Sequence, residues 1–209
     1  MFENEKQSLK AQIKLRQAFE KLKDHHIQVY LSDGNHDFIN GNIHPVTYTD
    51  NVFIFTSEEV SEFTYKKNGK PVATIYGFSY ENRAVTTKKA QEFKRIDNEA
   101  EYHIGMLHGC IQSNNEHDRD APFQLSDLQE KSFDYWALGH IHKRQMWSNV
   151  IPIVYPGNIQ GRHRNERGEK GCYHVTLSKG KSDLTFIPTH AITFEEVSVD
   201  VSECDDIYQ

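Results

Sequence analysis

Three short polar segments of this chain carry the residue types that bind metal ions and transfer protons. They are Gly34–Asp37 (Gly-Asn-His-Asp), His108 with the glycine that follows it, and His140–His142 (His-Ile-His). Histidine titrates near neutral pH and is the commonest metal ligand, and an asparagine side chain can add a neutral oxygen. The three segments therefore predict metal-assisted chemistry in which an imidazole also serves as a proton donor.

The segment Gly34–Asp37 places three functional groups in one tight turn. Asn35 can offer its amide oxygen to a metal ion. His36 can donate a proton or stabilise negative charge on a phosphoryl oxygen, and Asp37 can hold that imidazole in one tautomer. The alternative is a polar turn whose amide and carboxylate only form hydrogen bonds with each other.

The other two segments carry imidazoles alone. His140 and His142 are two residues apart, so on a turn after a strand they can point toward two adjacent ions. The alternative is a pair of exposed loop histidines. His108, taken by itself, is more typical of a hydrogen-bonded histidine than of a ligand.

The elements that must position these segments are three short β-prone runs. Residues 27–31, 102–107 and 135–138 each lead into one of the segments, and a helix over 11–22 precedes the first run. Because strands of one sheet deliver their carboxyl-end loops to one edge, we expect the three segments to converge. The alternation of helix and strand predicts an α/β fold.

Other elements follow from local patterns. The dipeptide Asn68-Gly69 between two β-prone runs predicts a hairpin, since it favours the tight turn that hairpins use. We expect a helix over 88–96 and a short helix that Ser126 caps. Further strands are predicted at 151–155, 172–177, 183–187 and 193–199.

Composition narrows the class of protein. The chain has 209 residues, enough for one domain, and a formal net charge of −6, which argues against binding nucleic acid through bulk positive charge but leaves room for a local basic groove. No apolar run approaches the roughly 18 residues of a membrane span. The three cysteines are far apart, so a disulfide framework is not expected and a cytoplasmic location is the simpler interpretation.

In this order the motifs resemble the calcineurin-like metallophosphoesterase superfamily. Residues 135–145 (YWALGHIHKRQ) and 155–163 (YPGNIQGRH) resemble more closely the SbcD-like DNA exonucleases, in particular their YhaO-like branch. The resemblance covers about residues 5–190. It implies a four-layer α/β/β/α sandwich and metal-dependent phosphodiester hydrolysis on DNA, as an exonuclease in repair. It also implies an SbcC-like ATPase partner and a homo-oligomer.

The resemblance also implies roles for individual residues. In such enzymes two divalent ions, commonly manganese, activate a shared water for attack on the phosphodiester. The matching positions divide into ligands of one ion (Asn35, His108 and His140) and a ligand of the other (His142). His36 matches the histidine that acts on the leaving oxygen, and Asp37 matches the residue that orients it. Mixed imidazole and oxygen ligands suit manganese, iron or zinc better than calcium.

Basic residues near the motifs are candidates for substrate contacts. Arg162 and His163 follow a Pro-Gly turn, and arginine forks match phosphate oxygens. The alternative is a solvated charged loop, and the same two interpretations apply to Lys143 and Arg144. A flexible acidic loop is the favoured interpretation of the segment that contains His117, Asp118 and Asp120.

Two parts of the family pattern have no match in this chain. An Asp-x-His motif on a first strand and a Gly-Asp motif after a second strand would supply the carboxylate that bridges both ions. We therefore expect Met1 to be an internal methionine of a longer protein. We expect residues 1–190 to form a nuclease domain that is incomplete at its amino end, and 191–209 to begin a C-terminal extension or linker.

Without a bridging carboxylate, two neighbouring dications repel each other strongly. The sequence therefore predicts that this chain alone binds at most one ion, weakly, and is inactive. An exposed sheet edge should also favour self-association. Two alternatives remain open: a phosphoesterase that acts on small phosphodiesters, and a non-catalytic binding domain with a metallophosphoesterase-like shell.

Overall fold

The computed structural model describes residues 9–41, 47–112, 120–147 and 151–202. Two α-helices, two 3₁₀ turns and ten strands lie within these ranges. In chain order they are α1 (Leu9–Asp24), β1 (Val29–Leu31), η1 (Ile39–Gly41), β2 (Val52–Ile54), β3 (Ser61–Lys67), β4 (Lys70–Gly77), η2 (Lys89–Glu92), β5 (Tyr102–His108), α2 (Leu125–Gln129), β6 (Tyr135–Gly139), β7 (Gln145–Trp147), β8 (Ile153–Tyr155), β9 (Gly171–Ser178) and β10 (Lys181–Pro188).

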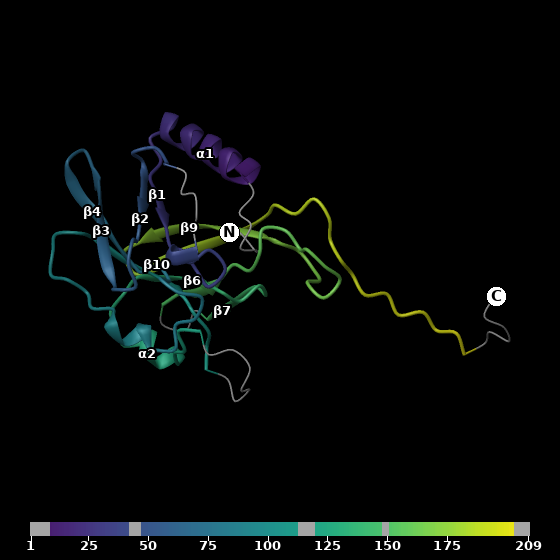
Figure 1. Cartoon of the computed structure of the whole chain (residues 1–209). Helices are drawn as coiled ribbons and strands as arrows, with labels where there is room; N and C mark the ends of the chain where they lie inside the picture. Colours follow the sequence, from purple (N-terminus) through teal and green to yellow (C-terminus); the bar gives the residue numbers. More distant parts are fainter. Residues whose placement is uncertain (1–8, 42–46, 113–119, 148–150, 203–209) are drawn as a thin grey trace.

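The centre of the molecule is a six-stranded mixed sheet in the order β3-β4-β5-β6-β8-β7. Strands β4, β5, β6 and β8 run parallel to their neighbours in this group, whereas β3 and β7 close the two edges as antiparallel strands. Two smaller sheets, β1-β2 and β9-β10, form a second layer, with α1 outside it and α2 on the far side of the central sheet (Figure 1). The α/β class and the layered arrangement are thus confirmed.

The main core lies between the central sheet and the segment that contains η2 and α2. Trp136 on β6 is fully buried, and the rings of Phe93 and Phe133 pack against it with centroid distances of 5.0 and 4.7 Å. Trp136 lies on the face of β6 that is opposite to Ala137, as the strand period of two requires. The parallel pairing of β5 with β6, in register from Ile104 and Tyr135 to His108 and Gly139, sets the positions at which the two strands end.

The other face of the central sheet is only partly covered. On β5, Tyr102, Ile104 and Met106 are half-buried, although the residues that alternate with them are buried. A groove of about 410 Å³ separates this face from Tyr173 and Val175 on β9. Parallel strands are normally covered on both faces, so this groove is an unusually open part of the fold.

Several local predictions are confirmed. Helix α1 and strands β1, β5 and β6 occur where the apolar patterns placed them. The β3-β4 hairpin turns at Asn68-Gly69, whose φ angles of 53° and 77° are the positive values that this turn requires. No helix within the described residues is long and apolar enough to cross a membrane.

Two predictions of helical structure need correction. Only the short turn η2 forms within 88–96, because Phe93 adopts an extended backbone (φ −65°, ψ 121°) that brings its ring into the core. The short helix α2 is capped by Gln124 in a reciprocal capping box with Asp127, and not by Ser126. In both cases packing or a neighbouring side chain outweighs the local pattern.

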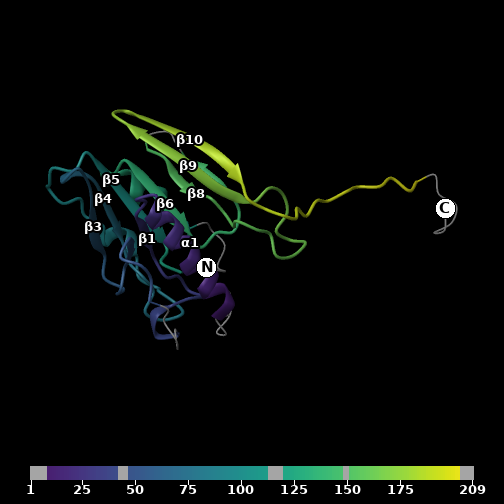
Figure 2. The ribbon, with the colours of Figure 1, turned by 90° about the horizontal axis from the view of Figure 1, so that it is seen from above.

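The strand prediction for 193–199 is also wrong. The segment is extended, but it pairs with no other described strand, and the tail runs away from the body of the molecule (Figures 1 and 2). Val197 and Val199 are 79% and 74% exposed. Alternating valines favour a strand only when a partner edge is present, and the described residues supply none here. Strand β7 was not predicted.

Candidate metal centre

The carboxyl ends of β5 and β6 bring two of the predicted ligands together. His108 is the last residue of β5 and pairs in register with Gly139, the last residue of β6. His140 follows directly, and its ring lies 5.2 Å from the His108 ring, centroid to centroid, at an angle of 72°. Adjacent parallel strands thus place two imidazoles at one edge of the sheet.

Asn35 reaches the same point from a different sheet. Within the described ranges, strand β1 pairs only with β2. Hydrogen bonds nevertheless connect the loop after β1 to the chain beyond β4: Tyr80 N donates to Asp33 O (3.0 Å), and Asp33 N donates to Ser79 Oγ (2.8 Å). The Asn35 Oδ1 atom lies 3.0 Å from His108 Nε2. The convergence therefore depends on loop contacts as well as on the shared sheet edge.

Gly34 allows this close approach. A Cβ atom at Gly34 would lie 2.4 Å from His108 Cε1 and 2.7 Å from His108 Nε2, far inside van der Waals contact. The imidazole therefore lies directly against the backbone of the Gly34–Asp37 turn. Only glycine fits there without displacement of the ring.

His140 has a backbone conformation that residues other than glycine rarely adopt, with φ at 97°. For a residue with a Cβ atom such a conformation costs on the order of 1–3 kcal/mol. The surrounding structure holds it there, and the effect is to turn the imidazole toward His108. Strain of this kind is typical of residues whose orientation matters to a site.

The protonation of His108 suits a metal ligand. Burial, together with the neighbouring His140, lowers the pKa of His108 to about 3, so the ring is neutral at physiological pH. Its Nε2–H donates to the Asn35 amide oxygen in the absence of an ion. Transfer of that proton to Nδ1 keeps the ring neutral and leaves two atoms with lone pairs that face each other across a gap of 3.0 Å.

This gap fits a metal ion. If two ligand atoms each lie about 2.1 Å from one ion and the ligand–metal–ligand angle is about 90°, the two atoms are about 3.0 Å apart. Asn35 Oδ1 and His108 Nε2 have this separation. Among the described residues, no three His, Cys, Asp or Glu side chains form a group that could hold a metal. A metal site here therefore depends on the Asn35 amide oxygen as a ligand.

His142 is held by a buried carboxylate. Its Nδ1 donates to Glu166 Oε1 (2.7 Å), and the same carboxylate accepts from Asn158 Nδ2 (2.9 Å) and Arg162 N (2.8 Å). Burial alone would raise the pKa of Glu166, but donation by the Arg162 backbone and by His142 brings it below its usual range. Sequence analysis missed Glu166, because a glutamate in a charged loop has no distinguishing local pattern.

One cavity of about 470 Å³ connects these groups. All six predicted metal and catalytic residues line it, together with one of the two predicted substrate contacts: Asn35, His36, Asp37, His108, His140, His142 and Arg162. His36 is exposed at its margin, and Asp37 Oδ1 accepts from Gly34 N (2.7 Å). His163 is exposed and does not line the cavity.

Two neighbouring residues differ from their expected places. Asp120 Oδ2 accepts from Asn35 Nδ2 (3.2 Å). The prediction that Asp120 belongs to a flexible acidic loop did not include this contact with a predicted ligand. His117 and Asp118 lie outside the described residues. Arg144 stacks on the Phe186 ring at 3.9 Å from its centroid, which keeps its guanidinium on β10.

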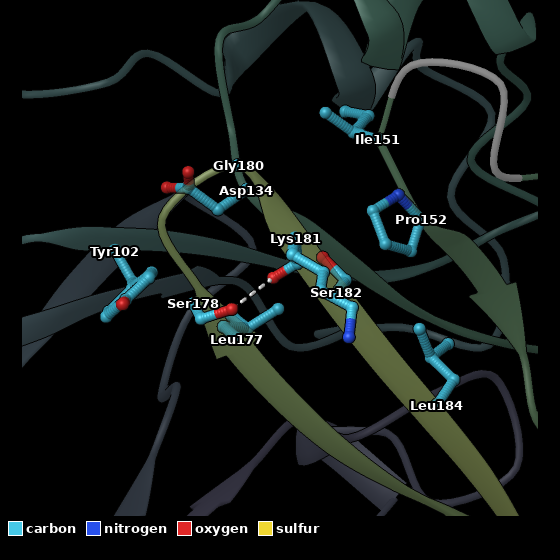
Figure 3. A pocket seen from close by; sticks show the side chains of 10 residues that line it. All are labelled: Tyr102, Asp134, Ile151, Pro152, Leu177, Ser178, Gly180, Lys181, Ser182 and Leu184. Atoms are coloured by element: carbon cyan, nitrogen blue, oxygen red, sulfur yellow. Dashed lines mark hydrogen bonds between the residues drawn. The ribbon is translucent and has the colours of Figure 1, made fainter.

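A second cavity lies at the opposite end of the central sheet. It has a volume of about 360 Å³. Its lining residues come mainly from the start of β5, the segment before β8 and the β9-β10 turn (Figure 3). Two of its polar side chains form hydrogen bonds within the chain: Ser178 Oγ donates to Lys181 O (3.2 Å), and Asp134 accepts from His103 N. None of the predicted functional residues lines it.

Comparison with known proteins finds a metallophosphoesterase and two DNA repair proteins among the relatives of this chain. The chain is 43% identical over 204 residues (97% of the chain, 50% of the relative) to the uncharacterized metallophosphoesterase YhaO of Bacillus subtilis. It is 30% identical over 199 residues (88% and 52%) to the DNA double-strand break repair protein Mre11 of Methanocaldococcus jannaschii. A second Mre11, from Sulfurisphaera tokodaii, is 26% identical over 132 residues (61% and 32%).

The share of each relative that the chain covers limits the conclusions that these matches support. No family model matches the chain. The chain spans about half the length of the first two relatives, YhaO and the Methanocaldococcus Mre11. The match to YhaO nevertheless covers nearly all of this chain, so the chain is related to the metallophosphoesterases.

Proposed function

We propose, from this relationship to metallophosphoesterases, that the chain carries part of a two-metal site that hydrolyses phosphodiester bonds in DNA. In the proposal Asn35, His108 and His140 bind one divalent ion and His142 binds a second. Manganese is the first candidate for both ions. We further propose that this chain is part of a longer protein, and that this longer protein acts as an exonuclease in DNA repair, in the cytoplasm.

The observation that carries the proposal is the meeting of Asn35 Oδ1 and His108 Nε2 at 3.0 Å, with the His140 ring beside them. A neutral amide oxygen and two neutral imidazoles suit a transition metal better than calcium. All three residues line one cavity with His36, which has an exposed ring and can protonate a leaving oxygen. Divalent ions in such a site supply charge neutralisation and an activated water.

DNA is the favoured substrate for two reasons. The exposed side chains of Lys143, Arg162 and His163 border the cavity or follow its lining residues, and basic side chains of this kind contact phosphates. Two of the relatives are named as DNA double-strand break repair proteins. We also propose an SbcC-like ATPase partner and a homo-oligomer, as the resemblance implies.

Metal titration of the purified chain tests the ligand assignment. We expect at most one Mn²⁺ per chain with weak affinity, because the described residues contain no group of three His, Cys, Asp or Glu side chains that could hold a metal, and neutral ligands leave two neighbouring dications to repel each other. Asn35→Ala and His108→Ala should abolish this binding. His174→Ala, which removes an exposed histidine from β9, is the matched control and should bind like the parent.

Activity assays test the substrate assignment. In the longer protein, linear double-stranded DNA should be degraded with Mn²⁺ present, and His36→Ala should stop this degradation without loss of Mn²⁺ binding. Cleavage of small phosphodiesters alone would favour the second candidate, a phosphoesterase with small substrates. Absence of Mn²⁺ binding and of hydrolysis in the longer protein would favour a non-catalytic binding domain.

A further inference from the structure

Glu166 is a charged residue that the structure buries beside the candidate site. Its side chain is 8% exposed, and both carboxylate oxygens are used. Oε1 accepts from His142 Nδ1 and Asn158 Nδ2, and Oε2 accepts from the Arg162 backbone. Burying a carboxylate is costly unless it is fully hydrogen bonded, so this arrangement is a built feature of the loop and not a chance contact.

The loop that carries Glu166 is itself well held. Glu166 N donates to His163 O (2.9 Å), and Gly168 N donates to Phe194 O (3.0 Å). Arg167 pairs with Glu196 and is therefore directed toward the tail. The carboxylate of Glu166 consequently has a fixed position relative to the His142 ring.

We propose that Glu166 is a positioning residue that holds His142 in the Nδ1–H tautomer and turns its Nε2 lone pair toward the metal cavity. The inference deepens the proposed function and rests on it, since it gives His142 a ligand atom. The His142 side chain is 45% exposed and lines the 470 Å³ cavity, so the ring edge opposite Glu166 is accessible.

The chemistry follows from what a carboxylate can do. An ionised carboxylate only accepts hydrogen bonds, so the imidazole nitrogen that faces it must carry the proton. In a neutral ring the second nitrogen is then an acceptor with a free lone pair. Carboxylates that hold histidine ligands in this way fix the ring orientation and increase its basicity, and their loss costs about 10- to 100-fold in metal affinity.

The same carboxylate joins the ligand to the proposed phosphate contact. Glu166 Oε2 accepts from the Arg162 backbone and Glu166 Oε1 accepts from His142. The Glu166 carboxylate therefore fixes His142 and Arg162 relative to each other. Asn158, which follows the turn at Pro156, is the third group held there. Loss of Glu166 should therefore displace both the ligand and the adjacent arginine.

Nitrogen-15 NMR of the histidine rings tests the tautomer in the metal-free chain at pH 8. We expect His142 to be the Nδ1–H form in the parent and to shift toward the Nε2–H form, which free histidine prefers, in Glu166→Ala. Glu166→Leu, which fills more of the vacated volume, should give the same shift and serves where the alanine variant folds poorly. Glu166→Gln retains an oxygen that can accept from Nδ1 and should restore the parent tautomer.

Two matched controls separate tautomer control from general disturbance of the loop. Glu169→Gln alters an exposed carboxylate of the same loop, and Asn158→Ala removes a donor to Glu166 while leaving the acceptor for His142. Both should keep the Nδ1–H form. An unchanged His142 tautomer in folded Glu166→Ala or Glu166→Leu would overturn the inference.

Metal binding is measured separately, so that the two proposals can fail independently. In the longer protein, Glu166→Ala should weaken Mn²⁺ binding about 10- to 100-fold and Glu166→Gln should restore most of it. If the parent binds no Mn²⁺ but the tautomer shifts as expected, the proposed function fails and the control of His142 by Glu166 stands. If the parent binds Mn²⁺ and Glu166→Ala binds equally well, the positioning role is refuted.

Discussion

Replacing Gly34 with alanine should disable the candidate metal site while leaving the fold intact. The added Cβ atom would lie 2.4 Å from His108 Cε1, 2.6 Å from Nδ1 and 2.7 Å from Nε2. Carbon atoms in good contact are about 3.5–4.0 Å apart, so the ring has to move back by about 1 Å. A shift of that size away from the turn would lengthen the 3.0 Å separation of Asn35 Oδ1 and His108 Nε2 to about 4 Å.

The surroundings make that movement costly. The His108 ring meets the Tyr80 ring edge-on at 5.2 Å on one side and the His140 ring at 5.2 Å on another, so it has little space to retreat. Overpacking of this kind costs about 1–3 kcal/mol of stability. For a chain of this size, that corresponds to a fall in Tm of roughly 2–12 °C. The affinity for the metal ion should fall by about 100-fold, because Asn35 Oδ1 and His108 Nε2 would no longer both be within coordination distance of one ion.

Isothermal titration with Mn²⁺ below the lowered Tm measures the effect. Gly69→Ala is the matched control: its φ of 77° makes alanine strained by about 1–2 kcal/mol, but nothing lies within 4 Å of the new Cβ atom. It should lower Tm and leave Mn²⁺ affinity unchanged. If folded Gly34→Ala binds Mn²⁺ as tightly as the parent, then His108 is not the ligand that we infer.

Three further predictions concern other parts of the site and core. His140→Gly should remove the backbone strain at φ 97° and so unfold at a higher temperature than His140→Ala in thermal melts, while both variants lose Mn²⁺ affinity. Asp120→Ala should weaken Mn²⁺ binding in titrations, because Asn35 Nδ2 loses its acceptor (3.2 Å) and the amide is free to flip; unchanged affinity would argue against this role. Burial and Arg95 lower the pKa of His103 in the folded state, so the unfolded chain takes up the proton first and the free energy of unfolding should fall as pH drops below about 6.5. Denaturant titrations should show a weaker decline in His103→Gln, and identical pH profiles would contradict the assignment.

Local patterns were sufficient for the parts of the fold that depend on neighbours in sequence. The Asn68-Gly69 turn was predictable because its backbone angles are a property of those two residues. The strands that end at His108 and Gly139 were predictable because each is an apolar run followed by glycine and polar residues. The expectation that their loops converge follows from a general property of parallel sheets and needs no further information.

The parts that could not be predicted depend on distant contacts. Glu166 is 24 residues from His142 along the chain, and Asp120 is 85 residues from Asn35, so neither pairing has a local pattern. The extended backbone at Phe93 is set by burial against Trp136 and overrides helix propensity. The valines of 193–199 alternate as a strand would, but a strand is a property of two segments and the described residues contain only one of them.

Two of the three segments that carry predicted ligands are also held by carboxylates that are not themselves predicted ligands. Asp37 accepts from the Gly34 backbone, Asp120 accepts from the Asn35 amide, and Glu166 accepts from His142. These carboxylates orient neutral groups, and they also add negative charge in the lining of the cavity (Asp37) or beside its lining residues (Asp120 and Glu166). Charge at that distance attracts a dication more weakly than a directly coordinated carboxylate would, since Coulomb energy falls with separation. If the proposed function is correct, the described residues should orient one weakly held ion, and a tightly bound pair would require carboxylate ligands beyond the ones assigned to this site.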